Sequence, residues 1–376
     1  MASAYVPGLK VADRMQVRRL RRLPIPGEVL VQQGQTVKPE DVVARAMLPG
    51  NPQTINVAHA MGVDAGGVPA VMLKKVGDEV AVGDLLAQSR GLFGLGKKEL
   101  KSPVAGRIEL ISNVTGQVTL REPPIPIEVS AYLSGRVAEI LPREGAVIET
   151  VGAMIQGIFG VGGERRGEIA IVATGPDQVL DAPALSGPLT GKVVVGGALV
   201  TAAALRRAAE AGVAAIVAGG IIDTDLIALI GHDLGVAITG QENIPFTLIL
   251  TEGFGAIPMA DRTWNLLRRL QGRSASVNGA TQIRAGVMRP EVIVPEPGQT
   301  VSSAAGDTEG GALEIGSVVR LIREPFFGQL AEVTELPAEL MEIETEAEVR
   351  VLRCRLRGGN GRVLTVPRAN VEILES

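Results

Sequence analysis

Polar and charged side chains gather in three turns in the middle of the sequence, and their types suit the binding of an anion. The turns are ITGQENIP (238–245), TEGFGAIPMADRT (251–263) and NGATQIRAGVMRPE (278–291). Arginine holds a carboxylate or phosphate by forked hydrogen bonds. The alternative is that these groups only satisfy the backbone of their own loops. The candidate ligand-binding residues are Gln241, Glu242, Asn243, Glu252, Asn278, Gln282, Arg284 and Arg289.

Two groups of arginines could contact the phosphates of a nucleic acid. The first lies in a basic N-terminal arm, residues 1–25, and the second alternates along a C-terminal strand, where such charges also protect a sheet edge. Residues 312–376 hold eight arginines against eleven glutamates, so nucleic acid is a possible but not a favoured partner. The candidate residues are Arg18, Arg19, Arg21, Arg22, Arg353, Arg355 and Arg357.

The sequence offers no catalytic or metal-binding constellation. His59 and His232 are the only histidines and Cys354 is the only cysteine, without the spacing of zinc ligands. No Gly-x-Ser-x-Gly nucleophile elbow occurs. We therefore assign no catalytic residue, metal or cofactor. Cys354 alternates with Leu352 and Leu356, which predicts that it is a buried apolar residue.

The middle of the chain, residues 165–295, has the alternation of a layered α/β domain. Short runs of Val, Ile and Ala at Val193–Val195 and Val213–Val217 flank a helix that Thr201 can cap and Gly212 can close. Further helices are expected at 225–234 and 262–270. This pattern predicts a largely parallel sheet that places the polar turns at its carboxyl edge, and it is similar to the swivelling β/β/α domains.

Residues 26–160 repeat one phrase four times. The copies are GEVLVQQGQTVKPEDVVARA (27–46), VMLKKVGDEVAVGDLLAQS (71–89), SPVAGRIELISNVTGQVTL (102–120) and YLSGRVAEILPREGAVIET (132–150). They resemble the barrel-sandwich hybrid, or hammerhead, of biotinyl and lipoyl carrier domains. In carriers of that family a hairpin tip bears the modified lysine. The corresponding stretch, QSRGLFGLGKKELK (88–101), lacks the flanking residues of that motif, which leaves modification of Lys97 or Lys98 open.

The C-terminal segment reads as a small β-barrel behind a linker. The linker is predicted at 296–311, where the composition is polar and rich in Gly and Ser. The stretches GSVVRLIREPFFGQLAEVTEL (316–336) and VRVLRCRLRGGNGRVLTVPRANVEIL (349–374) resemble the KOW module, an SH3-like barrel. The chain is thus expected to be a multidomain α/β plus all-β protein.

Composition sets broad limits on function. The chain has 376 residues, a net charge of −4 and one cysteine, and no apolar run long enough to span a bilayer. We expect a cytoplasmic protein without membrane insertion. The first hypothesis is a non-enzymatic scaffold or adaptor that contacts a protein partner, itself as a homo-oligomer, or both. The alternatives are a small anionic-ligand binder or enzyme that uses the middle polar loops, and an RNA-contacting factor of transcription or translation.

Overall fold

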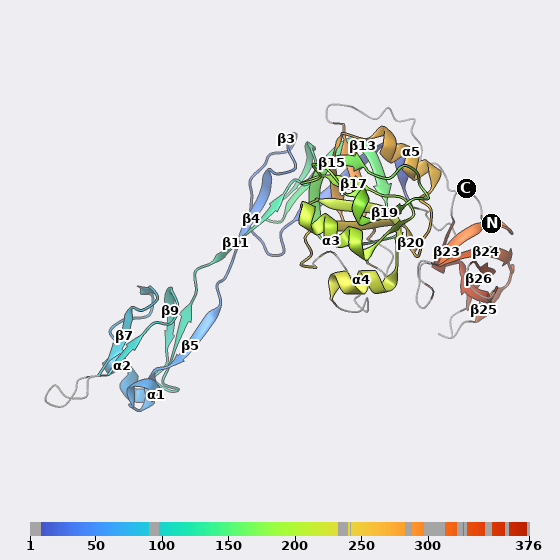
Figure 1. Ribbon diagram of the computed structural model, residues 1–376. Helices are drawn as coiled ribbons and strands as arrows, with labels where there is room; N and C mark the ends of the chain where they lie inside the picture. Colours follow the sequence, from blue (N-terminus) through green and yellow to red (C-terminus); the bar gives the residue numbers. More distant parts are fainter. Residues whose placement is uncertain are drawn as a thin grey trace.

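The computed structural model describes most of the chain and groups it into an α/β domain and three smaller β units (Figure 1). The described residues are 9–89, 98–231, 240, 242–282, 288–296, 313–321, 326, 329–342, 348–357 and 361–373. None of the helices among these residues has the length and apolar character needed to cross a membrane.

The α/β domain is built on the mixed half of a 13-stranded sheet. Its parallel strands are β15 (Glu164–Ile171), β17 (Val193–Val195), β19 (Ala215–Ile221) and β20 (Thr247–Phe254). Short strand β18 (Leu199–Val200) pairs with β19, and β16 (Val179–Leu180) pairs with β18. The expectation of a largely parallel sheet is too simple, because antiparallel strands border the parallel ones: β14 (Phe159–Val161), β21 (Ser274–Asn278) and β22 (Glu291–Pro295).

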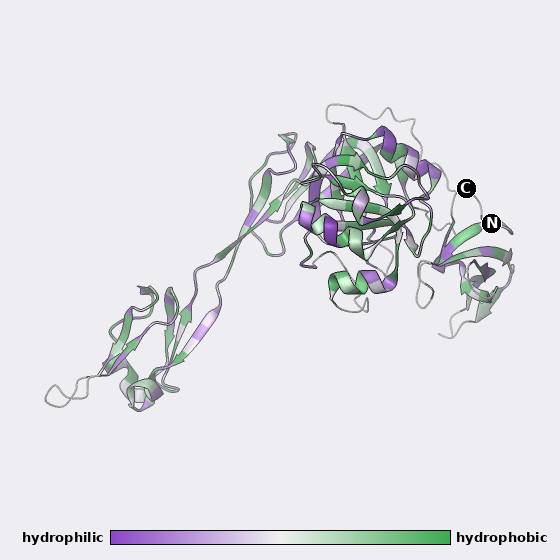
Figure 2. Cartoon of the chain, in the orientation of Figure 1, coloured by the Kyte–Doolittle hydropathy of each residue, from purple (hydrophilic) through white to green (hydrophobic). Residues whose placement is uncertain are grey.

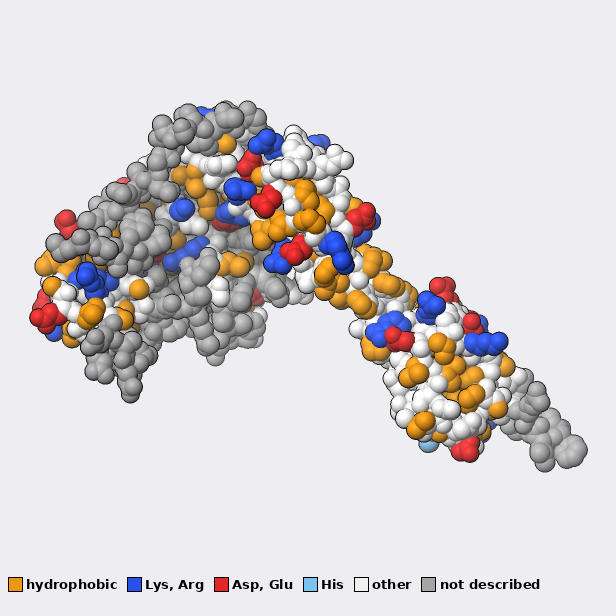
Figure 3. Space-filling view, turned by 180° about the vertical axis from the view of Figure 1, so that it is seen from behind, with side chains coloured by type: hydrophobic (Ala, Val, Ile, Leu, Met, Phe, Trp, Pro, Cys, Tyr) orange, Lys and Arg blue, Asp and Glu red, His pale blue; other side chains and the backbone are white. Residues whose placement is uncertain are grey.

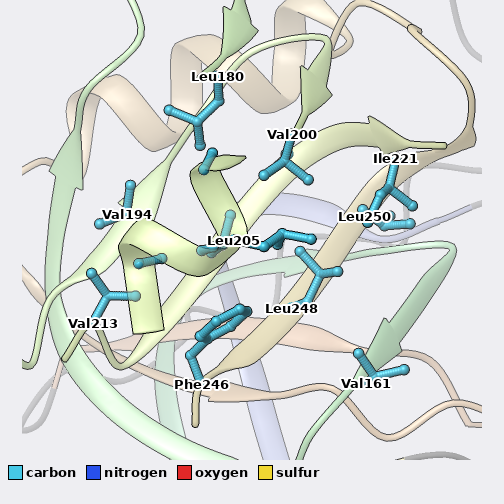
Figure 4. Packing of buried hydrophobic residues seen from close by; sticks show 14 of the residues in the cluster. Val161, Leu180, Val194, Val200, Leu205, Val213, Ile221, Phe246, Leu248 and Leu250 are labelled. Atoms are coloured by element: carbon cyan, nitrogen blue, oxygen red, sulfur yellow. The ribbon is translucent and has the colours of Figure 1, made fainter. Parts of the chain in front are cut away.

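Helices cover both faces of the central parallel strands β17, β19 and β20, so these three strands are buried on both sides. Val194 packs with α3 (Ala202–Ala211) and α4 (Asp223–Ile230), while its neighbours Val193 and Val195 pack with α5 (Asp261–Arg269). Figure 4 shows Leu205 of α3 among side chains of the strands. The predicted caps of α3 are confirmed: Thr201 accepts a hydrogen bond from the amide of Ala204, and Gly212 has a left-handed φ of 67°. The strands are correspondingly hydrophobic in Figure 2.

The four repeated phrases pair as the first with the fourth and the second with the third. They therefore form two units, one nested in the other. The base unit contains β2 (Glu28–Val29), β3 (Thr36–Val37), β4 (Val42–Leu48), β11 (Ile125–Ser130), β12 (Gly135–Leu141) and the start of β13 (Gly145–Gln156). The distal unit contains β5 (Pro52–Asn56), β6 (Glu79–Val80), β7 (Leu85–Gln88), β8 (Glu99–Lys101), β9 (Gly106–Ile111) and β10 (Gln117–Arg121).

The two units match residue by residue in their strand ladders. Gly135 pairs with Val37 in the base unit, as Gly106 pairs with Val80 in the distal unit. Each of these glycines lies so close to a neighbouring strand that an added Cβ would stand 2.2–2.3 Å from a carbonyl oxygen. Both ladders also skip one residue at the same place, Ala138 in β12 and Glu109 in β9. The distal unit is thus a second copy of the base fold.

The distal unit is inserted at the tip of the hairpin formed by β4 and β11, and it stands away from the rest of the chain (Figure 1). Two antiparallel segments, 48–52 and 121–125, form the stalk that connects it. Gly50 is required there, because a Cβ would lie 2.0 Å from the carbonyl oxygen of Glu122. The unit has its own core, capped by α1 (Val57–Met61), η1 (Ala65–Gly67) and α2 (Val68–Val71).

The equivalent hairpin of the distal unit is formed by β7 and β8. Its tip, residues 90–97, lies outside the described residues and includes Lys97. Lys98 follows the tip and is exposed. The question of a modified lysine therefore concerns this hairpin alone, because the tip of the base hairpin carries the distal unit.

The predicted basic N-terminal arm is a strand. Residues Val11–Arg22 form β1, which pairs along β13, with Val17 buried in the base core. The charge run concealed this strand, because the arginines face carboxylates on neighbouring strands. The predicted boundary near residue 160 is likewise not a break: β13 pairs with β12 and then with β22 of the α/β domain.

The C-terminal unit is an antiparallel six-stranded sheet. Its elements are β23 (Val318–Leu321), β24 (Leu330–Glu335), β25 (Leu340–Glu342), β26 (Glu348–Leu356), β27 (Val363–Pro367), η3 (Arg368–Asn370) and β28 (Val371–Ile373). Cys354 is fully buried in its core, as expected, and burial raises the pKa of its thiol. Of the predicted linker only Glu296 lies within the described residues, where it accepts a hydrogen bond from Arg273.

Candidate functional site

The carboxyl end of β20 carries a buried charged residue, Glu252, as the polar-turn pattern suggested. One of its carboxylate oxygens accepts a hydrogen bond of 3.0 Å from the backbone amide of Ala260, at the start of α5. The other accepts a hydrogen bond of 2.8 Å from Arg320 of the C-terminal unit. This edge of the sheet is therefore in contact with another part of the chain.

Arg320 and Glu372 reach this edge together because they are register partners on β23 and β28. Both are almost fully buried. Arg320 Nη1 lies 3.7 Å from the carboxylate of Glu372, and Arg289 Nη2 lies 3.8 Å from it on the side of the α/β domain. Two cations and two anions thus alternate across the contact, from Glu252 through Arg320 and Glu372 to Arg289. We call these four residues the C-terminal ion network.

Burial controls the acid–base behaviour of this network. It raises the pKa of Glu372, while the nearby charges of Arg320 and Arg289 act in the opposite direction. Burial also lowers the pKa of Arg289. Buried ions are retained at low cost only when each has a partner, so removal of one member leaves the others uncompensated. The geometry supports a structural contact that fixes the C-terminal unit to the α/β domain. Its ion pairs occupy the carboxyl edge of the sheet, where an anionic ligand was predicted.

The remaining candidate ligand residues do not join this network. Glu242 accepts hydrogen bonds of 2.8 Å from the amides of Gly162 and Gly240, and Asn278 accepts one from Ala280 in its own turn. These two side chains satisfy loop backbone, which was the alternative interpretation. Asn243 is exposed and Gln282 is half-buried. Gln241 and Arg284 lie outside the described residues.

Six of the seven arginines considered for nucleic-acid contact lie beside a glutamate. This pairing neutralises much of the local charge that phosphate binding needs. Arg355 is exposed on β26. The pairs are Arg18 with Glu139, Arg19 with Glu291, Arg21 with Glu164, Arg22 with Glu144, Arg353 with Glu335 and Arg357 with Glu332.

The base unit is joined to the α/β domain by a second set of partly buried charges. Arg19 of β1 donates to Glu291 of β22 through Nε at 2.8 Å, and the hydroxyl of Tyr132 lies 3.3 Å from the same carboxylate. Arg21 makes a forked contact of 2.6 and 2.7 Å with Glu164. Tyr132 is buried with a left-handed φ of 66°, and burial raises the pKa of its hydroxyl well above the usual range.

A shallow hollow lies at the same junction. It has a volume of about 190 Å³, and its polar lining comes from two arginines and three serines. Ligand pockets usually enclose about 300–1,000 Å³. Both arginines are also engaged, Arg166 with Glu40 and Arg273 with Glu296. The hollow is thus a poor fit to a small-molecule site. Its lining residues are Pro39, Ser134, Arg166, Arg273, Ser274, Ser276 and Pro295.

No protein-family model and no curated protein sequence matches this chain. The geometry alone therefore defines the site. Among the described residues no group of three or more His, Cys, Asp or Glu side chains is placed to hold a metal ion.

Sequence reasoning missed the residues that make these contacts: Arg320, Glu372, Glu291, Glu164 and Tyr132. A weak signal existed for two of them. Arg320 stands inside the apolar run VVRLI, and Glu372 inside VEI, so each strand carries one charge of opposite sign among residues with the pattern of a core. Buried charges in such strands are usually paired.

Proposed function

We propose that this protein is a non-enzymatic, cytoplasmic adaptor that acts through protein–protein contacts, and that the distal unit supplies the principal contact. The observation that carries the proposal is the contrast in how the parts are held. The base unit and the C-terminal unit are fixed to the α/β domain by buried charges, whereas the distal unit stands on its stalk with large apolar side chains exposed.

The exposed side chains of the distal unit suit binding to a protein surface. Val82 is 69% exposed and Val114 is 82% exposed, and Leu73 and Leu110 are each more than half exposed. Figure 3 shows hydrophobic side chains gathered over this unit. Exposed apolar patches on a folded unit mark contact surfaces more often than ligand sites. Four of the side chains first considered for a ligand, Glu242, Glu252, Asn278 and Arg289, are occupied within the chain, which supports the adaptor over the small-ligand alternative.

The experiment is site-specific photo-crosslinking of the full-length protein in its own cells. A photoreactive amino acid is placed in turn at Leu73, Val82, Leu110 and Val114. The matched control is Val179, which is 44% exposed on β16 of the α/β domain. We expect covalent protein adducts from at least one distal position and none from the control. Absence of adducts at all four positions would reject the adaptor function. If an anionic metabolite also stabilised the protein, the ligand-binding alternative would take its place.

A further inference from the structure

β1 is an edge strand of the 13-stranded sheet. It pairs with β13 alone, and no other strand among the described residues pairs with its free side. The amide of Leu23 donates to the carbonyl oxygen of Glu144, and the register runs back from there to Met15 without a shift. Bonded and free positions alternate along an edge strand of an antiparallel pair. In this stretch the odd-numbered residues therefore bond to β13, and the even-numbered ones turn their backbone groups outward.

Four outward residues form an open edge, which we call the β1 edge: Gln16, Arg18, Leu20 and Arg22. Within the described part of the chain their backbone groups receive one hydrogen bond, of 2.7 Å, from Nη1 of Arg19 to the carbonyl oxygen of Arg18. The second base sheet meets the inner face of β1, where Arg21 donates to the carbonyl oxygen of Ser130. All four outward side chains are exposed, Leu20 by 51%. Such an edge is a template for another extended segment.

The distal unit contains the same edge in a protected form. The registers of the two units place Pro52 and Thr54 of β5 where the base unit has Arg18 and Leu20. Proline has no N–H, and a proline or a short strand at an edge prevents the addition of a further strand. β5 has both features, with five residues, whereas β1 has 12 residues and no proline. The edge is thus blocked in one copy of the fold and open in the other.

The charges of the β1 edge decide what can pair with it. Arg18 and Arg22 stand on either side of Leu20, and their carboxylate partners, Glu139 and Glu144, lie toward β12 and β13 and not on the free side. Both ion pairs are exposed to solvent, and such pairs contribute little to stability. The two arginines are therefore able to turn to carboxylates that arrive at the free edge.

We propose that the β1 edge binds an extended acidic segment of a partner protein, which joins the sheet as an antiparallel strand. The segment carries carboxylates opposite Arg18 and Arg22 and an apolar residue opposite Leu20, so its pattern is acidic-x-apolar-x-acidic. Main-chain hydrogen bonds supply the affinity in strand addition, and alternate side chains supply the specificity. This surface is separate from the distal unit and gives the proposed adaptor a second contact.

A second copy of the chain does not fit the β1 edge. Two such edges paired about a twofold axis through Leu20 would set Arg18 of each copy against Arg22 of the other, and like charges directly opposite are destabilising. A single-stranded nucleic acid fits poorly as well. It has no peptide groups to match the row of free amides and carbonyls, and the four residues include no aromatic side chain on which a base could stack.

The first experiment measures binding of a fluorescein-labelled peptide, Gly-Ser-Thr-Glu-Thr-Val-Thr-Glu-Thr-Ser, to the full-length protein by fluorescence anisotropy. Leu20→Asp should weaken binding at least about tenfold, because a carboxylate would then lie among the acidic side chains of the peptide. The matched control is Thr54→Asp, which adds the same charge at the equivalent place of β5 and should leave the affinity unchanged. Both positions are exposed, so circular dichroism should show that each variant keeps the fold.

A second pair of variants separates the backbone contact from charge. Arg18→Pro removes an outward N–H, as Pro52 does in β5, and should weaken binding at least about tenfold. Arg18 and Arg136 oppose Glu149 from its two sides, so Arg136→Gln removes the same charge away from the free edge and should have little effect. Methylation of the peptide at the valine nitrogen should abolish binding to the unaltered protein. This measurement keeps the test valid if Arg18→Pro lowers stability.

Hydrogen–deuterium exchange gives a direct measure of strand addition. The amides of Arg18 and Leu20 should exchange rapidly in the free protein and slowly with the peptide bound, while β5 is unchanged. No saturable binding, equal binding of the methylated peptide, or equal weakening by Leu20→Asp and Thr54→Asp would overturn the proposal. Tighter binding of oligouridine than of the peptide would also overturn it. The distal photo-crosslinks are measured independently, so this inference can fail while the adaptor function stands.

Discussion

The base unit and the distal unit share one fold, but only one of them is docked. The base unit buries Tyr132 and places charged residues against the α/β domain. In the distal unit the strand registers place Pro103, Gln53 and Gly83 where the base unit has Tyr132, Arg19 and Glu40, and the unit stays in solvent. The difference shows that the fold alone does not create the interface. The docked copy carries charged side chains at the junction and continues through β13 into the α/β sheet, and the distal copy does neither.

The largest effect should follow from removal of the anchoring side chain of the base unit. Tyr132→Ala should lower the free energy of unfolding by about 3–5 kcal/mol, because it leaves a cavity and strips a partner from Glu291. Urea denaturation of the full chain measures this change. The distal counterpart Pro103→Ala should change stability by less than about 1 kcal/mol. Equal losses from the two substitutions would contradict the distinction between docked and free units.

A smaller effect is expected when Arg19 of the base unit is replaced by glutamine, the residue type at the equivalent place in the distal unit, Gln53. Arg19→Gln leaves the carboxylate of Glu291, which is 8% exposed, without its cation. Removal of one partner of a buried pair costs about 3–5 kcal/mol, and the partial exposure of Arg19 reduces this to about 2–3 kcal/mol. The exchange in the other direction, Gln53→Arg, should change stability by no more than about 0.5 kcal/mol. Thermal unfolding of the two variants tests whether the site or the residue type decides the outcome.

The smallest effect concerns pH at the other docked unit. The folded protein holds the proton of Glu372 more tightly than the unfolded chain does, because burial raises its pKa. This contribution to stability is therefore present below the unfolded pKa and is lost as the pH rises through the higher folded value. The free energy of unfolding should therefore fall as the pH rises through the folded pKa of Glu372. Glu372→Gln should abolish this loss in urea denaturation at a series of pH values.

The matched control for that series is Glu335→Gln. Glu335 is exposed beside Arg353 in the same unit, so its removal should leave the pH dependence in place. A pH dependence that survives in Glu372→Gln would assign the effect to another group. Among the described residues of the distal unit no carboxyl is buried, so substitutions there should leave the profile unchanged.

Local signals in the sequence predicted the local structure well. Thr201 and Gly212 defined the ends of α3, and the valine runs defined its flanking strands, because a βαβ unit depends on neighbours in the chain. The four phrases were also visible. Their pairing was not, since each phrase carries the same turn signals and nothing local states that residues 27–46 meet 132–150 across an inserted unit.

The candidate site was predictable only in part. Glu252 and Arg289 were identified as polar residues at a sheet edge, and the structure places both in one network. Their partners Arg320 and Glu372 belong to a separate unit, so no spacing in the sequence links them. β1 was not predicted, for a related reason. Its run of arginines is typical of a solvated arm, and the carboxylates that pair with them lie more than a hundred residues away in the sequence.

The stalk has a mechanical consequence. A single flexible linker lets a tethered unit turn freely, but two antiparallel segments leave together from β4 and β11 and enter the distal unit together. Rotation about the long axis must twist both segments around each other, so the pair resists torque while it still allows bending. Gly50 lies where the segments approach so closely that a Cβ would meet the carbonyl oxygen of Glu122. A partner bound by the distal unit would therefore be held in a restricted set of orientations relative to the rest of the molecule.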